Sequence, residues 1–194
     1  MTAPIGLNVR KRQATRDRIA ATAARLVADD GLAATTIDRI ASQAEVGRAT
    51  FFRYFASKED AVAHGMTRRW LDVITAQVVV QPADLCARDA VMAAFRTLGD
   101  DFDAVSAQVR DLATMTRSSL ALSAWTLQIY VGYENAIAEL VAPRFRHLRP
   151  DDPRPRLIGV LAMASVRIAL DDWLRHGGSL PQRIQDAMGT LAVS

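Results

Sequence analysis

The sequence contains few cysteine, proline, glycine and aromatic residues, and these low counts exclude several classes of protein. Cys86 is the one cysteine among 194 residues, so no intramolecular disulfide can form and no cysteine-based metal site is expected. Seven prolines and ten glycines leave long stretches rich in Ala and Leu, which favours a mostly helical protein. The longest apolar run, residues 157–166, is too short to span a bilayer, and the N-terminus lacks the apolar segment of a signal peptide. We therefore expect a cytoplasmic protein.

Sequence patterns typical of enzymes are also missing. His64, His147 and His176 lie far apart in the chain and match no nucleophile or zinc motif, and no glycine loop for phosphate is present. Paired aspartates such as Asp171–Asp172 are expected to cap helices or face solvent, because adjacent residues on a helix point in different directions. We predict no catalytic site, no metal and no cofactor.

The net charge of +3 is small, but it is unevenly distributed. Residues 1–70 hold 12 Lys and Arg against 7 Asp and Glu, a net +5, whereas residues 71–194 hold 12 against 14, a net −2. This asymmetry suggests an N-terminal part that binds a polyanion, joined to a nearly neutral body.

The first third of the chain shows the pattern of several helices. A basic arm of about ten residues precedes a helix that begins near Lys11 and is stopped by Gly31. A short helix capped by Thr35 or Thr36 follows, then a turn over residues 45–47 and a third helix over residues 48–54. Ser57 begins a long helix that reaches about residue 80, with Asp60 completing a capping box.

The remainder also reads as helices. The expected spans are 83–98, 101–116, 118–141, 153–175 and 180–192, with residues 143–156 as the clearest linker. Pro153 is expected at the first helical position behind Asp152, and Gly177 with Gly178 ends that helix. The fold class predicted is therefore all-α, with about nine helices.

The stretch VGRATFFRYFASKED, residues 46–60, combines aromatic rings with cations, which suits neither a core nor a plain solvated surface. Two helices joined by a tight turn and braced by a third form a DNA-binding helix-turn-helix, whose second helix enters the major groove. Val46, Phe51 and Phe55 would hold that helix against the others. The side chains expected to face DNA are Arg48, Thr50, Phe52, Arg53 and Tyr54.

The segment GLAATTIDRIASQAEVGRATFFRYFASKEDAV resembles the N-terminal signature of TetR-type transcriptional regulators over some thirty positions. The chain departs from that signature at several places. The turn glycine is Glu45 here, the capping serine is Gly47, and the next glycine is Ala49; the tyrosine is Phe52 and the histidine is Tyr54. We expect Glu45 to point away from phosphate.

The resemblance implies roles for individual residues. Thr36 and Ile37 begin the helix whose N-terminus meets phosphate, and Arg48 and Ala49 take positions that often reach base edges. The implied phosphate contacts are Thr50, Phe52, Tyr54 and Lys58. Together with Arg53, these form the predicted DNA-binding set.

TetR-type proteins are all-helical dimers, so the resemblance implies that the last two long helices pack against their symmetry mates as a four-helix bundle. Residues 157–174 support this independently, since apolar side chains occupy nearly every face of the helix. Gly159, Ala162, Ala164 and Ala169 would allow the partner helix to approach closely. The alternative is a central core helix within a monomer. The predicted domains are residues 1–56, which bind DNA, and residues 57–194, which bind an effector and dimerise.

The middle helices carry apolar side chains that would either line a ligand cavity or simply fill the core. The candidates are Met66, Trp70, Met92, Phe95, Phe102, Met115, Trp125, Tyr130 and Tyr133. The segments AWTLQIYVGYENAIAEL and DDWLRHGGSL resemble the acyl-CoA-responsive branch of the family, which includes regulators of mycofactocin loci. That resemblance implies an acyl-CoA effector, whose phosphates Arg110, Arg117 or Arg144 would meet.

The function predicted is a sequence-specific repressor that binds a near-palindromic operator in double-stranded DNA as a homodimer. A small apolar effector would release it by moving the helix of residues 57–80. The alternatives are an effector-independent helix-turn-helix protein, an activator, or a sensor of a protein partner.

Overall fold

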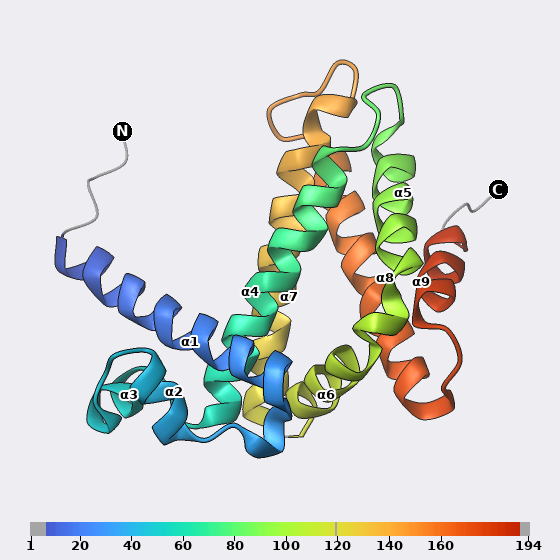
Figure 1. The fold of residues 1–194 in the computed structure, drawn as a ribbon. Helices are drawn as coiled ribbons and strands as arrows, with labels where there is room; N and C mark the ends of the chain where they lie inside the picture. Colours follow the sequence, from blue (N-terminus) through green and yellow to red (C-terminus); the bar gives the residue numbers. More distant parts are fainter. Residues whose placement is uncertain (1–6, 119, 191–194) are drawn as a thin grey trace. The chain divides into compact units, whose positions relative to one another are not determined.

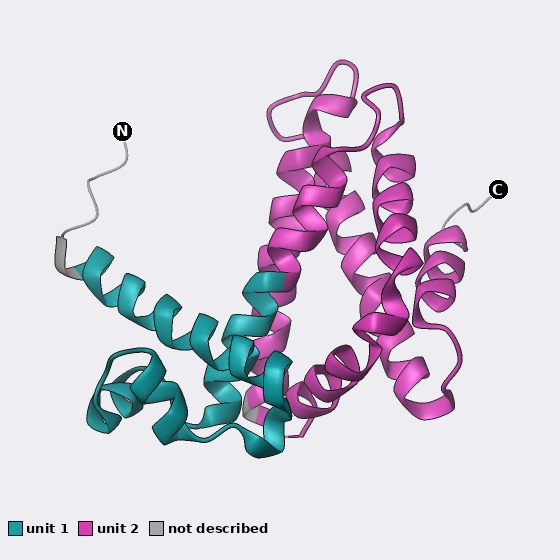
Figure 2. Ribbon diagram, in the orientation of Figure 1, with its two compact units in different colours: residues 1–69 teal, residues 70–194 magenta. Residues whose placement is uncertain are grey.

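The computed structural model describes residues 7–118 and 120–190, and within them it contains nine α-helices, two short 3-10 helices and no strand (Figure 1). The all-α prediction is confirmed for these residues. The chain divides into two compact units, residues 1–69 (unit 1) and residues 70–194 (unit 2), as coloured in Figure 2. The boundary lies inside α4 (Lys58–Val79), so this helix contributes residues to both units.

Unit 1 begins with α1 (Leu7–Ala34), followed by α2 (Ile37–Gln43) and α3 (Arg48–Tyr54). The helix therefore starts earlier than predicted, and residues 1–6 of the expected arm lie outside the described residues. Gly31 has φ 83° and ψ 163°, which interrupts α1 where the sequence predicts its end. The bounds of α3 are those predicted.

The core of unit 1 joins these helices through large apolar side chains. Ile19 and Leu26 of α1, Ile40 of α2, Phe51 of α3 and the adjoining Phe55 are each at most 2% exposed. Ile19 and Leu26 lie seven residues apart on one face of α1, so a small set of buried side chains fixes the arrangement of α1, α2 and α3.

Side-chain caps begin α2 and α4, as the sequence predicts. Thr36 Oγ1 accepts a hydrogen bond from the Arg39 amide at 3.2 Å, and Ser57 Oγ accepts one from the Asp60 amide at 3.1 Å. In a usual capping box the Asp60 carboxylate would accept a hydrogen bond from the Ser57 amide. Here it accepts from the amide of the preceding residue, Ala56, at 3.1 Å.

Unit 2 contains the rest of α4 and the remaining helices. They are α5 (Ala87–Asp100), η1 (Phe102–Ala104), α6 (Ser106–Thr116), α7 (Leu120–Val141), η2 (Ala142–Arg144), α8 (Arg154–His176) and α9 (Leu180–Gly189). Gly177 with φ 68° ends α8, and Ser179 caps α9 by accepting from the Gln182 amide at 3.3 Å. Both features match the prediction.

Several boundaries in unit 2 differ from the prediction: α7 begins at Leu120 rather than residue 118, and α9 ends at Gly189 rather than residue 192. Three further differences have visible causes or consequences. The α5 helix starts later than expected because Cys86, with its Sγ 3.5 Å from the Asp89 amide, takes the cap position. The span 101–116 is divided into η1 and α6 at Val105. Pro153 is the cap residue of α8 rather than its first helical residue.

Packing within the single chain explains three of the small residues assigned to dimer contacts, and for these the prediction is wrong. A Cβ built on Gly159 would overlap the carbonyl group of Glu134 in α7, and Ala162 and Ala169 are 3% and 2% exposed within the single chain. They allow α8 to pack against helices of its own chain. Ala164 is half-buried.

Apolar side chains also remain on the outside of α8. Leu157, Leu161 and Ile168 are 52%, 36% and 49% exposed, and with Ala164 they recur at i, i+4, i+7 and i+11. We call these four residues the α8 stripe; the spacing places them on one face of the helix. None of the described helices is long and apolar enough to cross a membrane.

Candidate DNA-binding surface and effector cavity

The α3 helix separates its aromatic rings between core and solvent. Phe51 and Phe55 are buried, with ring centroids 5.9 Å apart, whereas Phe52 is 47% exposed. The Phe51 and Phe52 rings meet edge to face at 5.5 Å. The buried rings therefore fix α3 in unit 1 while Phe52 stays on its outer surface, as the sequence predicts for an anchored recognition helix.

Two arginines on α3 are held close to aromatic rings. The Arg48 guanidinium carbon lies 5.5 Å from the centre of the Phe52 ring, and that of Arg53 lies 5.4 Å from the centre of the Tyr54 ring. Arg48 Nη1 also donates to Asp38 Oδ1 at 2.6 Å. Because this ion pair is exposed, water and salt screen it, and it leaves Arg48 available to exchange Asp38 for a nucleic-acid acceptor.

Lys58 has a structural role within unit 1. Its Nζ donates to the Leu32 carbonyl at 2.9 Å and to the Thr35 carbonyl at 3.0 Å, which ties the start of α4 to the segment that follows the break in α1. A lysine ammonium has three N–H donors. One donor therefore remains for the phosphate contact predicted from the sequence.

The other residues of the predicted DNA-binding set lie at the start of α2 and along α3. Thr36 and Ala49 are exposed, and Ile37, Thr50 and Tyr54 are half-buried. Glu45 in the turn is exposed and has φ 53°, a left-handed conformation that favours glycine. This explains why the TetR-type signature has glycine at this position.

A polar cluster that sequence reasoning missed lies inside unit 1. Arg16 Nη2 lies 2.8 Å from His64 Nε2, and His64 Nδ1 lies 3.6 Å from Asp60 Oδ1. The Phe55 ring packs edge to face against the His64 ring at 5.4 Å. The polar contact with the His64 imidazole holds the pKa of the Asp60 carboxyl below its ordinary value, against the opposing effect of burial.

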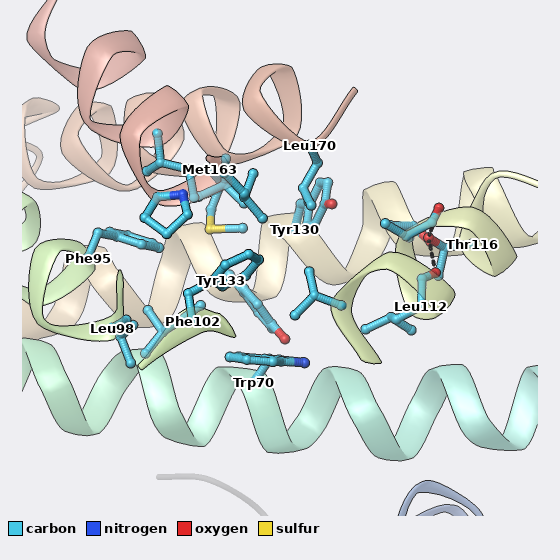
Figure 3. A pocket seen from close by; sticks show the side chains of 18 of the residues that line it. Trp70, Phe95, Leu98, Phe102, Leu112, Thr116, Tyr130, Tyr133, Met163 and Leu170 are labelled. Atoms are coloured by element: carbon cyan, nitrogen blue, oxygen red, sulfur yellow. Dashed lines mark hydrogen bonds between the residues drawn. The ribbon is translucent and has the colours of Figure 1, made fainter. Parts of the chain in front are cut away.

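Unit 2 contains an apolar cavity of about 140 Å³ (Figure 3). Its walls come from α4, α5, η1, α6, α7, α8 and α9. The figure shows Phe95 and Leu98 at one end, Trp70 along one side, and Leu112 with Thr116 at the other end. The volume is close to that of engineered apolar cavities that hold a benzene-sized molecule.

Polar groups gather at the Thr116 end of the cavity. Arg117 lines it and donates through Nε to Asp171 Oδ1 at 2.7 Å and through Nη1 to the Ala113 carbonyl at 3.0 Å. Burial raises the pKa of the Tyr130 phenol, and the nearby Arg117 guanidinium only partly offsets this rise. Tyr130 is therefore a neutral hydrogen-bonding group at physiological pH.

The structure brings five of the predicted ligand residues to the cavity: Trp70, Phe95, Phe102, Tyr130 and Tyr133. The other four are not among the lining residues. Met66 is buried in unit 1, and Met115 is 6% exposed on another side of α6. Met92 packs against the core of unit 2, and Trp125 is half-buried in α7.

Of the three arginines suggested for phosphate contacts, Arg117 lines the cavity and two have other partners. The Arg110 guanidinium carbon lies 4.0 Å above the Trp173 ring, and the Trp173 indole donates to the Gly178 carbonyl at 2.9 Å. Arg144 donates to the carbonyl groups of Gln81, Pro82 and Leu85 at 2.9, 2.6 and 3.2 Å, which fixes the loop between α4 and α5.

Sequence reasoning missed most of the aliphatic wall of the cavity, including Leu112, Met163, Leu170 and Ile184. Leucine, isoleucine and methionine occur in every core, so the sequence holds no signal that separates cavity walls from core. Among the described residues no group of three or more His, Cys, Asp or Glu side chains is placed to hold a metal ion.

Comparison with protein families gives two matches that together cover most of the chain. Residues 19–63 match the model of bacterial regulatory proteins of the tetR family, and residues 85–193 match the MftR C-terminal domain. The first match contains α2, the turn and α3, and the second contains α5 to α9.

Named relatives and a solved structure agree with these matches. The transcriptional regulator TcmR of Streptomyces glaucescens is 31% identical over 181 residues, which cover 87% of this chain and 76% of that protein. MftR of Mycobacterium tuberculosis, whose name describes a mycofactocin biosynthesis transcriptional regulator, is 26% identical over 86% of this chain and 83% of that protein. FadR of Thermus thermophilus, a repressor solved with lauroyl-CoA, has the same fold, with a TM-score of 0.62 at 18% identity over 91% and 92% of the chains. The chain belongs to the TetR family of transcriptional regulators, with a C-terminal domain of the MftR type, and is not an enzyme.

Proposed function

We propose that this regulator is a repressor that binds a near-palindromic operator as a homodimer and is released when a small apolar effector enters the cavity of unit 2. The observation that carries the proposal is the presence of an exposed cationic recognition helix and an apolar cavity in one chain. A repressor of this kind acts on the chromosome, in the cytoplasm.

The DNA-binding part of the proposal is supported by the exposure and chemistry of α3. Arg48 and Arg53 stand beside the exposed or half-exposed rings of Phe52 and Tyr54, and a guanidinium is suited to the paired acceptors of a guanine edge. Two such helices in a symmetric dimer would read half-sites about 34–36 Å apart, in successive major grooves.

The α8 stripe supports dimerisation. Four apolar residues on one helix face would be covered by the same face of a second copy, because a two-fold axis brings identical surfaces together. Including the neighbouring exposed Val160, this face can form the centre of an interface that needs about 800 Å² from each partner.

The α4 helix connects effector and DNA within the proposal. Lys58 at its start is bonded to the end of the α1 segment, and Trp70 and Ile74 further along line the cavity. A ligand that prefers one position of α4 would shift the population of α3 orientations. A coupling of about 1–3 kcal/mol would weaken DNA binding about 5–150-fold.

An acyl-CoA is the candidate effector. The FadR neighbour was solved with lauroyl-CoA, and the apolar cavity of unit 2 has an arginine in its wall. A cavity of about 140 Å³ holds only a short part of an acyl chain, so side chains would have to move to admit a long one. A protein without an effector would not need a cavity of this kind, which counts against the effector-independent alternative.

Two measurements test the proposal. Titration of the protein–operator complex with acyl-CoAs of graded chain length should release DNA, and no shift at saturating ligand rejects this effector class. Arg48→Ala should relax preference at one base position by about 1–3 kcal/mol, whereas Arg96→Ala, an exposed arginine of unit 2, should not. An unchanged base preference in Arg48→Ala would refute the role of this side chain in reading bases.

A further inference from the structure

The polar end of the cavity is built around an arginine whose charge is already balanced. Arg117 Nε donates to Asp171 Oδ1 at 2.7 Å, and both side chains are less than a third exposed. Arg117 is the only Lys, Arg, Asp or Glu among the described lining residues. An anionic ligand group placed at Arg117 would therefore also meet the Asp171 carboxylate a few ångströms away, and the two charges largely cancel.

The other lining groups at this end are neutral, and the one further cation acting on Tyr130, Arg167, is exposed and lies outside the lining. Tyr130 keeps its phenolic proton because burial raises its pKa, and it can donate to a ligand. Thr116 Oγ1 donates to the carbonyl groups of Leu112 and Ala113 at 2.9 and 3.2 Å, so its proton is engaged within α6 (Figure 3). A guanidinium has five N–H donors, of which only some are used by Asp171 and Ala113, so Arg117 can still donate as well.

We infer that the effector carries an uncharged hydrogen-bond acceptor, such as the oxygen of a ketone, ester or thioester, which Arg117 and Tyr130 bind, and that Asp171 makes the cavity discriminate against carboxylates. The inference deepens the proposed function and rests on the cavity being the effector site. It assigns Asp171 as a specificity-determining residue, acting through the charge it places beside Arg117.

The apolar end of the cavity determines the size and polarity of the rest of such a ligand. Phe95, Leu98 and Phe102 form an apolar end, and Trp70 and Tyr133 add rings along the side. A benzene-sized body with a short alkyl group fits this volume without a charged group entering the apolar end.

The test measures binding directly, in the absence of DNA. Calorimetric titration of the full chain with 4-ethylacetophenone and 4-ethylbenzoate at pH 7.5 compares a ketone with a carboxylate of nearly the same shape. Wild-type protein should bind the ketone at least about tenfold more tightly than the carboxylate, because the carboxylate must lose its water beside Asp171. Equal affinities, tighter binding of the benzoate, or binding of neither compound at millimolar concentration would overturn the inference.

Two variants locate the discrimination. Asp171→Asn keeps an oxygen for Arg117 but removes the charge, so benzoate affinity should rise about tenfold relative to the ketone. The control Asp172→Asn changes the neighbouring acid, which pairs with Arg175 and does not line this cavity, and should leave the ratio unchanged. An unchanged ratio in Asp171→Asn would contradict the role of Asp171.

Tyr130→Phe provides a second variant that keeps the size of the side chain. Loss of the phenol should weaken the ketone about 2–10-fold, the effect of one neutral hydrogen bond, while thermal unfolding shows whether the fold is intact. Unchanged ketone affinity in a folded Tyr130→Phe protein also counts against the inference. If selectivity is as inferred but neither compound alters DNA binding, the release step of the proposed function fails and the inference stands.

Discussion

Glu45 lies in the turn between α2 and α3 with φ 53°, where a side chain crowds the following backbone. Glu45→Gly removes this strain, although glycine loses more chain entropy on folding, so we expect a net gain of about 0.5–1 kcal/mol. The thermal midpoint should rise by about 2–3 °C, as measured by circular dichroism. Glu45→Asn, which tolerates the same conformation, should also stabilise, and a lower midpoint in both variants would show that the turn is not strained.

Asp60 links the cap of α4 to His64, and its lowered pKa makes a prediction about pH. A carboxyl whose folded pKa lies below its unfolded value contributes stability above about pH 4, and loses it as pH falls through the folded pKa. Asp60→Asn should therefore lower the unfolding free energy by about 1 kcal/mol at pH 6 and flatten its decline between about pH 5 and 3. Urea unfolding across this range measures both effects.

The matched control for this prediction is Asp29→Asn, an exposed position on α1 with the same change of charge. Its stability curve should follow that of the wild type. If Asp60→Asn and Asp29→Asn behave alike, the contact between Asp60 and His64 does not contribute to stability.

Much of unit 1 could be predicted at the level of helices because its signals are local. Gly31, Thr36 and Ser57 each end or begin a helix through their own backbone or side chain, and the structure confirms all three.

In unit 2, the division of residues 101–116 at Val105 was missed, because no proline or glycine lies within that span and the break depends on how η1 and α6 pack.

The cavity was predicted only in part, for a physical reason. Large aromatic side chains such as Trp70 and Tyr133 were correctly expected at the cavity. Which face each helix turns toward the cavity depends on tertiary packing, which the sequence does not show. Met92 and Met115 therefore were expected at the cavity but lie elsewhere in the core. The ion pair of Arg117 and Asp171 joins residues that are far apart in the sequence, so no local sequence pattern predicts it.

Close contact between α7 and α8 depends on one glycine. Because a Cβ on Gly159 would overlap the backbone of Glu134, Gly159→Ala must push the helices apart, and we expect a loss of about 1–3 kcal/mol. Gly132→Ala is the control within α7: nothing lies within 4 Å of its built Cβ, so the higher helix propensity of alanine should stabilise by about 0.5–1 kcal/mol. Chemical unfolding compares the two, and equal effects would contradict the packing described.

At the scale of the whole molecule, the α8 stripe is proposed to join two copies. Ile168→Asp buries a charge without a partner in that interface, which should shift the dimer to monomer and weaken operator binding at least about tenfold. Analytical ultracentrifugation measures the mass directly. The control is Val80→Asp, an even more exposed apolar position that is not part of the stripe, which should remain dimeric; a dimeric Ile168→Asp would place the interface elsewhere.

The central claim is that two copies of α3, each anchored by Phe51 and Phe55, read neighbouring turns of one duplex. Selection of bound sequences from a random duplex library by the purified protein tests it most directly. We expect a near-palindromic motif whose half-sites are centred one or a small whole number of helical turns apart, about 10–10.5 base pairs per turn. Recovery of no motif, or of a single asymmetric half-site bound by one chain, would contradict the account.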